Sequence, residues 1–99
     1  MSKLIYLDNA ATTKLNSDAL EAMIPWLTEE YGNASQPYSF SRKPKKAIAE
    51  ARQIIAECIN ALPEEIYFTS GGTESDNWAL IGSAFGDFEK RATITSEIE

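Results

Sequence analysis

The clearest pattern in the chain is an apolar stripe between residues 47 and 62. Its members recur at the spacing of one face of an α-helix: Ala47, Ile48, Ala51, Ile54, Ile55, Cys58, Ile59 and Leu62. Pro44 suits the first turn of such a helix, where the amides have no intrahelical partner, and Asn60 and Pro63 close it. We therefore predict a helix that begins near residues 41–44 and ends between Asn60 and Pro63, with Cys58 buried as a small hydrophobic side chain.

Two further helices follow from similar patterns. The first has N-cap residue types at positions 16–18, followed by apolar side chains at helical spacing: Leu20, Met23, Ile24, Leu27 and Tyr31. Pro25 lies inside this pattern, so we expect it to kink or split the helix, which Gly32 then ends. The second helix is predicted over residues 74–85, with large apolar side chains along one side.

Three short segments carry the residue types of β-strands. They are residues 3–7, 65–70 and 91–96, which are rich in branched and aromatic side chains. Residues 65–70 and 91–96 predict short strands, and residues 3–7 predict a short strand or an extended segment. The order of strand, helix and strand predicts an α/β fold with a parallel element. Two or three short strands are few for a complete sheet, whose two faces both need covering. The sequence is therefore typical of part of a larger fold.

One turn has the features of an anion site. It is Ser-Gly-Gly-Thr at residues 70–73, between a predicted strand and a predicted helix. The first amides of a helix have no internal acceptor, glycines let a phosphate approach them, and Thr73 can add a hydroxyl donor. The turn matches neither the Walker pattern nor the dinucleotide glycine pattern. The alternative is a tight turn in which Thr73 caps the helix without a ligand. Glu74 and Asp76 slightly favour that alternative, because carboxylates repel phosphate, and the local pattern leaves both interpretations open.

Two other features have ordinary structural interpretations. Asp8 and Asn9 are residue types that favour a turn. The alternative interpretation is that residues 9–13 form a polar loop that lines a cleft. A local basic cluster predicts the solvated face of a helix, the usual role of a charge run: Arg42, Lys43, Lys45, Lys46 and Arg52.

Composition narrows the classes of function. Nine basic and fifteen acidic residues give a net charge of −6, which disfavours a nucleic-acid partner. No apolar run approaches the roughly 20 residues of a membrane span, and the first seven residues do not form a signal peptide. A single cysteine permits no internal disulfide, so we expect a cytoplasmic location. The chain has no histidine, which excludes a histidine metal site and a Ser-His-Asp triad within it.

Three segments match a known family in order and spacing. They are YLDNAATT at residues 6–13, YGNAS at residues 31–35 and FTSGGTESDN at residues 68–77. Together they closely resemble the N-terminal quarter of the cysteine desulfurases, the NifS-like enzymes of the class V aminotransferase group. The resemblance extends over essentially all 99 residues.

The resemblance implies a fold and a domain organisation. The expected fold is a partial type I aminotransferase fold, an α/β architecture with three main helices and two or three short strands. Residues 1–99 then form a single fragment. Residues 1–15 belong to the family's small domain, and residues 16–99 begin its large cofactor-binding domain.

The resemblance also implies an activity. Cysteine desulfurases use pyridoxal 5′-phosphate to take sulfur from L-cysteine. They leave L-alanine and an enzyme persulfide, whose sulfur supplies iron–sulfur cluster assembly or thiolation through an acceptor protein. They are homodimers in which both subunits shape each active site. By resemblance, Gly72 and Thr73 hold the cofactor phosphate, and residues 9–12 lie near the substrate entrance.

The chain departs from the family pattern in one loop. Tyr38 and Ser41 stand where the family often has histidine and glycine, Ala34 stands where it has proline, and Arg42 is kept. Because this loop tends to lie near the partner subunit in the family, the family's dimer contacts and substrate preference are not carried over to it.

The family's catalytic residues define a second difference. Its ring-stacking histidine, Schiff-base lysine and persulfide cysteine correspond to positions after Glu99, so no catalytic residue is assigned and the chain alone is expected to lack desulfurase activity. Uncovered helix faces at Ile48, Ile55 and Ile59 predict a homo-oligomer. The alternatives are a non-catalytic interaction or dimerisation module, a class V relative with another amino-acid substrate and, least favoured, a standalone phosphate-binding domain.

Overall fold

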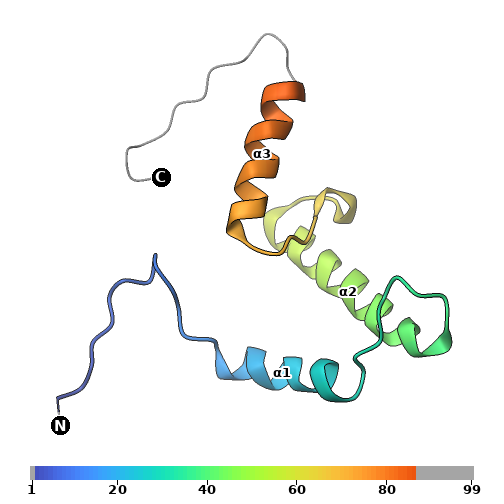
Figure 1. The fold of residues 1–99 in the computed structure, drawn as a ribbon, viewed down its shortest axis with the longest axis horizontal. Helices are drawn as coiled ribbons and strands as arrows, with labels where there is room; N and C mark the ends of the chain where they lie inside the picture. The colour runs from blue at the N-terminus through green and yellow to red at the C-terminus, as the bar shows by residue number, and fades with distance from the viewer. Residues whose placement is uncertain (1, 87–99) are drawn as a thin grey trace. The chain divides into compact units, whose positions relative to one another are not determined.

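The computed structural model describes residues 2–86, which fall into two units that divide between Pro63 and Glu64 (Figure 1). The first unit holds α1 (Ser17–Thr28), the short 3₁₀ helix η1 (Ser39–Ser41) and α2 (Arg42–Ile59). A second 3₁₀ turn, η2 (Pro63–Glu65), marks the division, and the second unit holds α3 (Gly72–Gly86). The three predicted helices are therefore confirmed.

The predicted strands are not found in the part of the chain that the structure describes. Residues 65–70 are not a strand. Of the two alternatives for residues 3–7, the strand is not found, and residues 91–96 lie outside the described residues. A strand forms only when its amides and carbonyls pair with a neighbouring strand, so its existence depends on more than its own residues. Strand-forming side chains alone did not suffice, so the predicted α/β class is not seen in residues 2–86.

Helix α1 begins as the sequence predicts and ends earlier. The Asn16 side-chain oxygen accepts hydrogen bonds from the amides of Asp18, at 2.8 Å, and Ala19, at 3.3 Å. The helix runs through Pro25 as one element, so of the expected kink or split the split does not occur. Proline lacks a donor but keeps its carbonyl, which accepts from the amides of Glu29 and Glu30 at the end of the helix.

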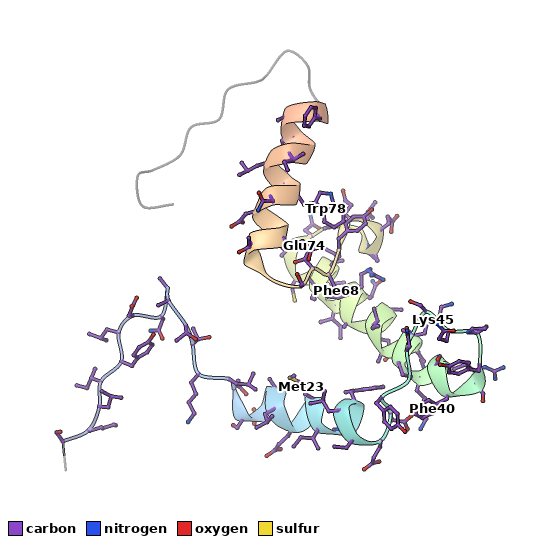
Figure 2. All side chains as sticks on the ribbon, in the orientation of Figure 1. Met23, Phe40, Lys45, Phe68, Glu74 and Trp78 are labelled. Carbon is purple, nitrogen blue, oxygen red and sulfur yellow. The ribbon has the colours of Figure 1, made fainter. Side chains whose placement is uncertain are left out.

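Gly32 has a different role from the one predicted. It does not end α1, and no glycine in residues 2–86 has a positive φ. The chain needs a glycine here because the backbone passes close to Phe40, which Figure 2 labels in the segment leading into α2. A Cβ on Gly32 would lie 2.6 Å from the Phe40 carbonyl oxygen and 3.0 Å from its ring.

Two side-chain contacts close the same loop. The rings of Tyr31 and Phe40 meet edge to face, with their centroids 5.2 Å apart. Lys43 at the start of α2 forms an ion pair with Glu30, just after α1. This hydrogen bond and the charge of Glu30 raise the pKa of Lys43. The loop between the first two helices is thus fixed by contacts between its ends.

Helix α2 ends as the sequence predicts. Asn60 adopts the left-handed conformation, with φ 55° and ψ 44°. The Ala61 amide donates to the Ala56 carbonyl at 2.9 Å, and the Asn60 amide donates to the Glu57 carbonyl at 3.4 Å. This is the Schellman arrangement, which satisfies carbonyls that the end of a helix would otherwise leave open.

The apolar stripe of α2 is largely uncovered. Among the hydrophobic side chains of the described residues, only Ala56 is fully buried, while Ile55 is 40% and Ile59 65% exposed. Cys58 is exposed as well, so the prediction that it is buried is wrong. The helical period was read correctly, but within its own unit α2 packs mainly against η1, which is too short to cover the stripe. No helix in residues 2–86 combines the length and apolar character needed to cross a membrane.

We predict that Gly32→Ala destabilises the first unit by about 1–3 kcal/mol, because the new methyl group overlaps the Phe40 backbone. Thermal unfolding followed by circular dichroism measures the effect. Gly82→Ala is the matched control: its Cβ would meet only the Trp78 ring, at 3.9 Å, and alanine favours helix. Equal melting temperatures for the Gly32 variant and the original chain would contradict the close approach.

We predict that Ser41→Ala stabilises the chain by about 1 kcal/mol. Ser41 is 1% exposed, and its hydroxyl has no hydrogen-bond partner within the described structure. An unpaired buried hydroxyl is unfavourable, and alanine removes it without leaving a large cavity. Urea unfolding measures the change, with the exposed Ser39→Ala as the control. A destabilised Ser41→Ala would mean that the hydroxyl does find a partner.

Candidate functional site

The candidate site is the turn that leads into α3 in the second unit. The helix begins at Gly72, two residues before the predicted start, and the Gly71 carbonyl accepts the first helical hydrogen bond from the Ser75 amide at 3.2 Å. Thr73 is therefore not the N-cap, and that part of the ligand-free interpretation of the turn is wrong. Gly72 and Thr73 are instead the first two helical residues, whose amides have no acceptor within the helix.

Both glycines leave the backbone open. A Cβ placed on Gly71 or on Gly72 would meet no atom within 4 Å. Neither glycine has a positive φ, so neither is required by backbone conformation. Their effect is to leave space beside the first amides of α3, where the helix dipole places partial positive charge. Thr73 is exposed and carries its hydroxyl at the same helix start.

Glu74 is held beside the turn by Ser70. One oxygen of its carboxylate accepts hydrogen bonds from the Ser70 amide, at 2.8 Å, and from the Ser70 hydroxyl, at 2.5 Å. The arrangement is a capping box shifted by one residue, because the glutamate at the third helical position reaches the residue before the N-cap. Both hydrogen bonds lower the pKa of Glu74, and the bond from the Ser70 side chain has the larger effect. Figure 2 labels Glu74 at the start of α3.

Two hydroxyls converge on the Gly71 carbonyl. Thr69 Oγ1 lies 3.1 Å from the carbonyl oxygen, Ser75 Oγ lies 3.3 Å from it, and the two hydroxyl oxygens are 2.5 Å apart. Since each hydroxyl carries one proton, one donates to the carbonyl and the other donates to the first hydroxyl. Residues before and after the two glycines are thereby joined.

Further contacts hold the segment before the turn to α3. The rings of Tyr67 and Trp78 are 5.3 Å apart at an angle of 59°. The Asn77 side chain donates to the Thr73 carbonyl at 2.8 Å, one turn back along the helix. The backbone of the turn is therefore tied down by side chains, while the amides of Gly72 and Thr73 stay accessible.

Sequence reasoning missed the parts played by Ser70 and Glu74. It treated Glu74 as an acid that would repel a phosphate, although the structure ties its carboxylate to Ser70. The signal was available, since a serine four residues before a glutamate at a helix start resembles a capping box. No group of acidic, cysteine or histidine side chains in residues 2–86 is arranged to hold a metal ion.

The other sequence candidates lie in the first unit and have structural roles there. The Ala11 amide donates to the Asp8 carbonyl at 3.2 Å, and the Tyr6 hydroxyl donates to the same carbonyl at 2.7 Å, which confirms the turn. In the basic cluster, Lys46 pairs with Glu50 at 3.5 Å on an exposed helix face. This pairing agrees with the interpretation of the cluster as a solvated surface.

Comparison with known protein families adds to this geometry. The aminotransferase class-V family model matches residues 5–99. The chain belongs to the class V aminotransferase family. No solved structure matches the chain.

The chain also matches named relatives of this family. It is 48% identical to cysteine desulfurase IscS of Methanosarcina thermophila, over 99% of the chain and 24% of the relative. It is 48% identical to the IscS protein of Clostridium botulinum strain Kyoto, over 100% of the chain and 25% of the relative. A cysteine desulfurase of Cereibacter sphaeroides is 46% identical over 96% of the chain. The chain thus spans about a quarter of the length of these curated relatives and is homologous to their N-terminal part.

We predict that Glu74 titrates below the ordinary glutamate pKa of about 4.3, because its charged form accepts both Ser70 hydrogen bonds. Because the pKa of Glu74 is lower in the folded chain than in the unfolded chain, these bonds stabilise the fold at pH values above the unfolded pKa. This stabilisation is lost as the pH falls through the folded pKa. The Ser70 amide chemical shift, followed by NMR during acid titration, reports this loss.

Glu74→Gln is the control for this titration, since glutamine keeps an acceptor but does not ionise, and its Ser70 amide should stay constant. A Ser70 midpoint at or above that of a short peptide with the same residues would contradict the assignment.

Proposed function

We propose that the chain is the N-terminal part of a pyridoxal-phosphate-dependent cysteine desulfurase. The proposed reaction converts L-cysteine to L-alanine and an enzyme persulfide, whose sulfur goes to an acceptor protein for iron–sulfur clusters or thiolation. The observation that carries the proposal is 48% identity to cysteine desulfurases along essentially the whole chain. The family match over residues 5–99 supports the same conclusion.

Within this proposal, Gly72 and Thr73 hold the phosphate of the cofactor. The open space beside the glycines and the free first amides of α3 fit such a group. The Gly72 and Thr73 amides donate to the phosphate oxygens, and the Thr73 hydroxyl adds a third donor. Pyridoxal phosphate, when bound, supplies an electron sink for the amino-acid substrate.

The chain's remaining roles are positioning and assembly. The Schiff-base lysine, the ring-stacking histidine and the persulfide cysteine of the family correspond to none of residues 1–99, so we assign no catalytic residue here. The expected domain assignment, with residues 1–15 in the small domain and residues 16–99 in the large one, is part of this proposal. The proposed site of action is the cytoplasm, where a thiol that carries sulfur stays reduced.

The exposed helix faces favour a homo-oligomeric assembly. Ile48 on α2 is 41% exposed and Leu27 on α1 is 66% exposed. Apolar surfaces of this kind are normally covered by another part of a protein or by a second copy. The same exposure supports the second candidate function, a non-catalytic interaction or dimerisation module.

The test of the phosphate site uses pyridoxine 5′-phosphate, which lacks the aldehyde and so cannot react with surface lysines. We expect the 99-residue chain to bind it by equilibrium dialysis and to bind pyridoxine, which lacks the phosphate, far more weakly. Thr73→Val should weaken binding roughly tenfold, because it removes one donor to a charged group and leaves the shape unchanged.

The matched control is Thr28→Val, the same change in α1, where the hydroxyl donates to the Ile24 carbonyl at 2.8 Å. It should leave the affinity unchanged. Equal affinity for the two vitamers, or for the Thr73 variant and the original chain, would argue against the site. Absence of binding would favour the interaction module.

A further inference from the structure

The turn at the start of α3 poses a physical problem for ligand binding. Gly71 and Gly72 are adjacent, and nothing lies within 4 Å of either Cβ position. Glycine loses more conformational freedom on ordering than any other residue. A turn of two unsupported glycines would therefore have to be ordered by the ligand itself, at a cost in affinity. Something outside the glycines must fix their backbone if the site is to be formed in advance.

The first support is the pair Ser70 and Glu74. The carboxylate of Glu74 takes both donors of Ser70, the amide at 2.8 Å and the hydroxyl at 2.5 Å. Ser70 is the residue before the glycines and Glu74 is the third residue of the helix. The pair thus spans the turn. Because both Ser70 donors are used, Ser70 offers none to a phosphate, and the donors of Gly72 and Thr73 are among those that remain at the turn.

The second support is the pair Thr69 and Ser75. Their hydroxyls lie 2.5 Å apart, and both lie within 3.3 Å of the Gly71 carbonyl oxygen. This pair spans the same turn one residue further out on each side. It fixes the orientation of the peptide group between Gly71 and Gly72, and hence the direction of the Gly72 amide. Because the Gly71 carbonyl and the Gly72 amide belong to one planar peptide group, fixing the carbonyl also fixes the amide.

We propose that these four residues form a clamp, defined as the pairs Ser70–Glu74 and Thr69–Ser75, that holds the glycine turn ready for the cofactor phosphate. Glu74 and Ser75 are positioning residues, which act through the backbone of Gly71 and Gly72 and do not touch the phosphate. The inference rests on the proposed function and deepens it. Its particular claim is that Glu74 supports anion binding through its hydrogen bonds, although its charge has the same sign as the ligand's.

Two substitutions of Glu74 separate hydrogen bonding from charge. Glu74→Ala removes both, and we expect the affinity for pyridoxine 5′-phosphate to fall roughly tenfold. Glu74→Gln removes the charge but keeps an oxygen that accepts from Ser70, so its affinity should stay within about twofold of the original. Ser75→Ala should weaken binding several-fold. Glu50→Ala, on the exposed face of α2, is the control and should have no effect.

A second readout needs no ligand. The amide at position 75 donates to the Gly71 carbonyl at 3.2 Å, so its hydrogen exchange reports on the order of that peptide group. Measured by NMR on the 99-residue chain, this exchange should be faster in Glu74→Ala and Ser75→Ala and unchanged in Glu74→Gln. The Asn60 and Ala61 amides at the end of α2 serve as an internal reference for folding. If Glu74→Ala fails to fold, Ser75→Ala and Glu74→Gln still decide the question.

The outcomes separate the clamp from the proposed function. Tighter binding by both Glu74 variants would show that charge repulsion dominates, and it would overturn the clamp. Binding by the original chain that depends on Thr73 but is unchanged in Glu74→Ala and Ser75→Ala would overturn the clamp alone. If the original chain binds no pyridoxine 5′-phosphate, the proposed phosphate site fails and the clamp's role in ligand binding fails with it.

Discussion

Hydrogen bonds at the ends of the helices are the main contacts that define this structure, because almost none of the apolar side chains in residues 2–86 is buried. Asn16 caps the start of α1, the left-handed Asn60 closes α2, and the Ser70–Glu74 pair supports the start of α3. Each of these devices satisfies backbone groups that a helix end cannot pair internally. They are local in sequence, so they form without help from distant parts of the chain. In the described helices, hydrogen bonds at the ends are therefore more complete than the burial of the apolar faces.

The apolar side chains of the described helices are largely exposed to solvent. The stripe of α2 has the period of a helix packed against a core, yet Ile59 and Cys58 are exposed. The segments at residues 3–7 and 65–70 have strand composition and yet are not strands in the described part of the chain. Both observations have one physical cause, since burial and strand pairing need a second surface. The chain spans about a quarter of the length of the curated relatives that it matches.

The candidate site shows how one short turn combines several local rules. Two glycines leave room beside the first amides of α3, and the residues on either side hold the turn through side chains. An acidic residue next to an anion site looks unfavourable on charge alone. Glu74 is nevertheless tied to Ser70, so the geometry of its hydrogen bonds decides its role together with its charge. Phosphate sites at helix starts depend on this kind of preformed backbone.

The sequence by itself determined the three helices, the turn at Asp8, the end of α2 at Asn60 and the glycine turn at residues 70–73, because capping residues and helical period act locally. It also carried the family motifs. Only the tertiary structure decided that Gly32 serves a close approach to Phe40 and that Cys58 is exposed. These depend on which atoms lie nearby in space. The strand predictions failed in residues 2–86 for the same reason. Composition determines which conformation a segment favours, whereas strand formation depends on its surroundings in the fold.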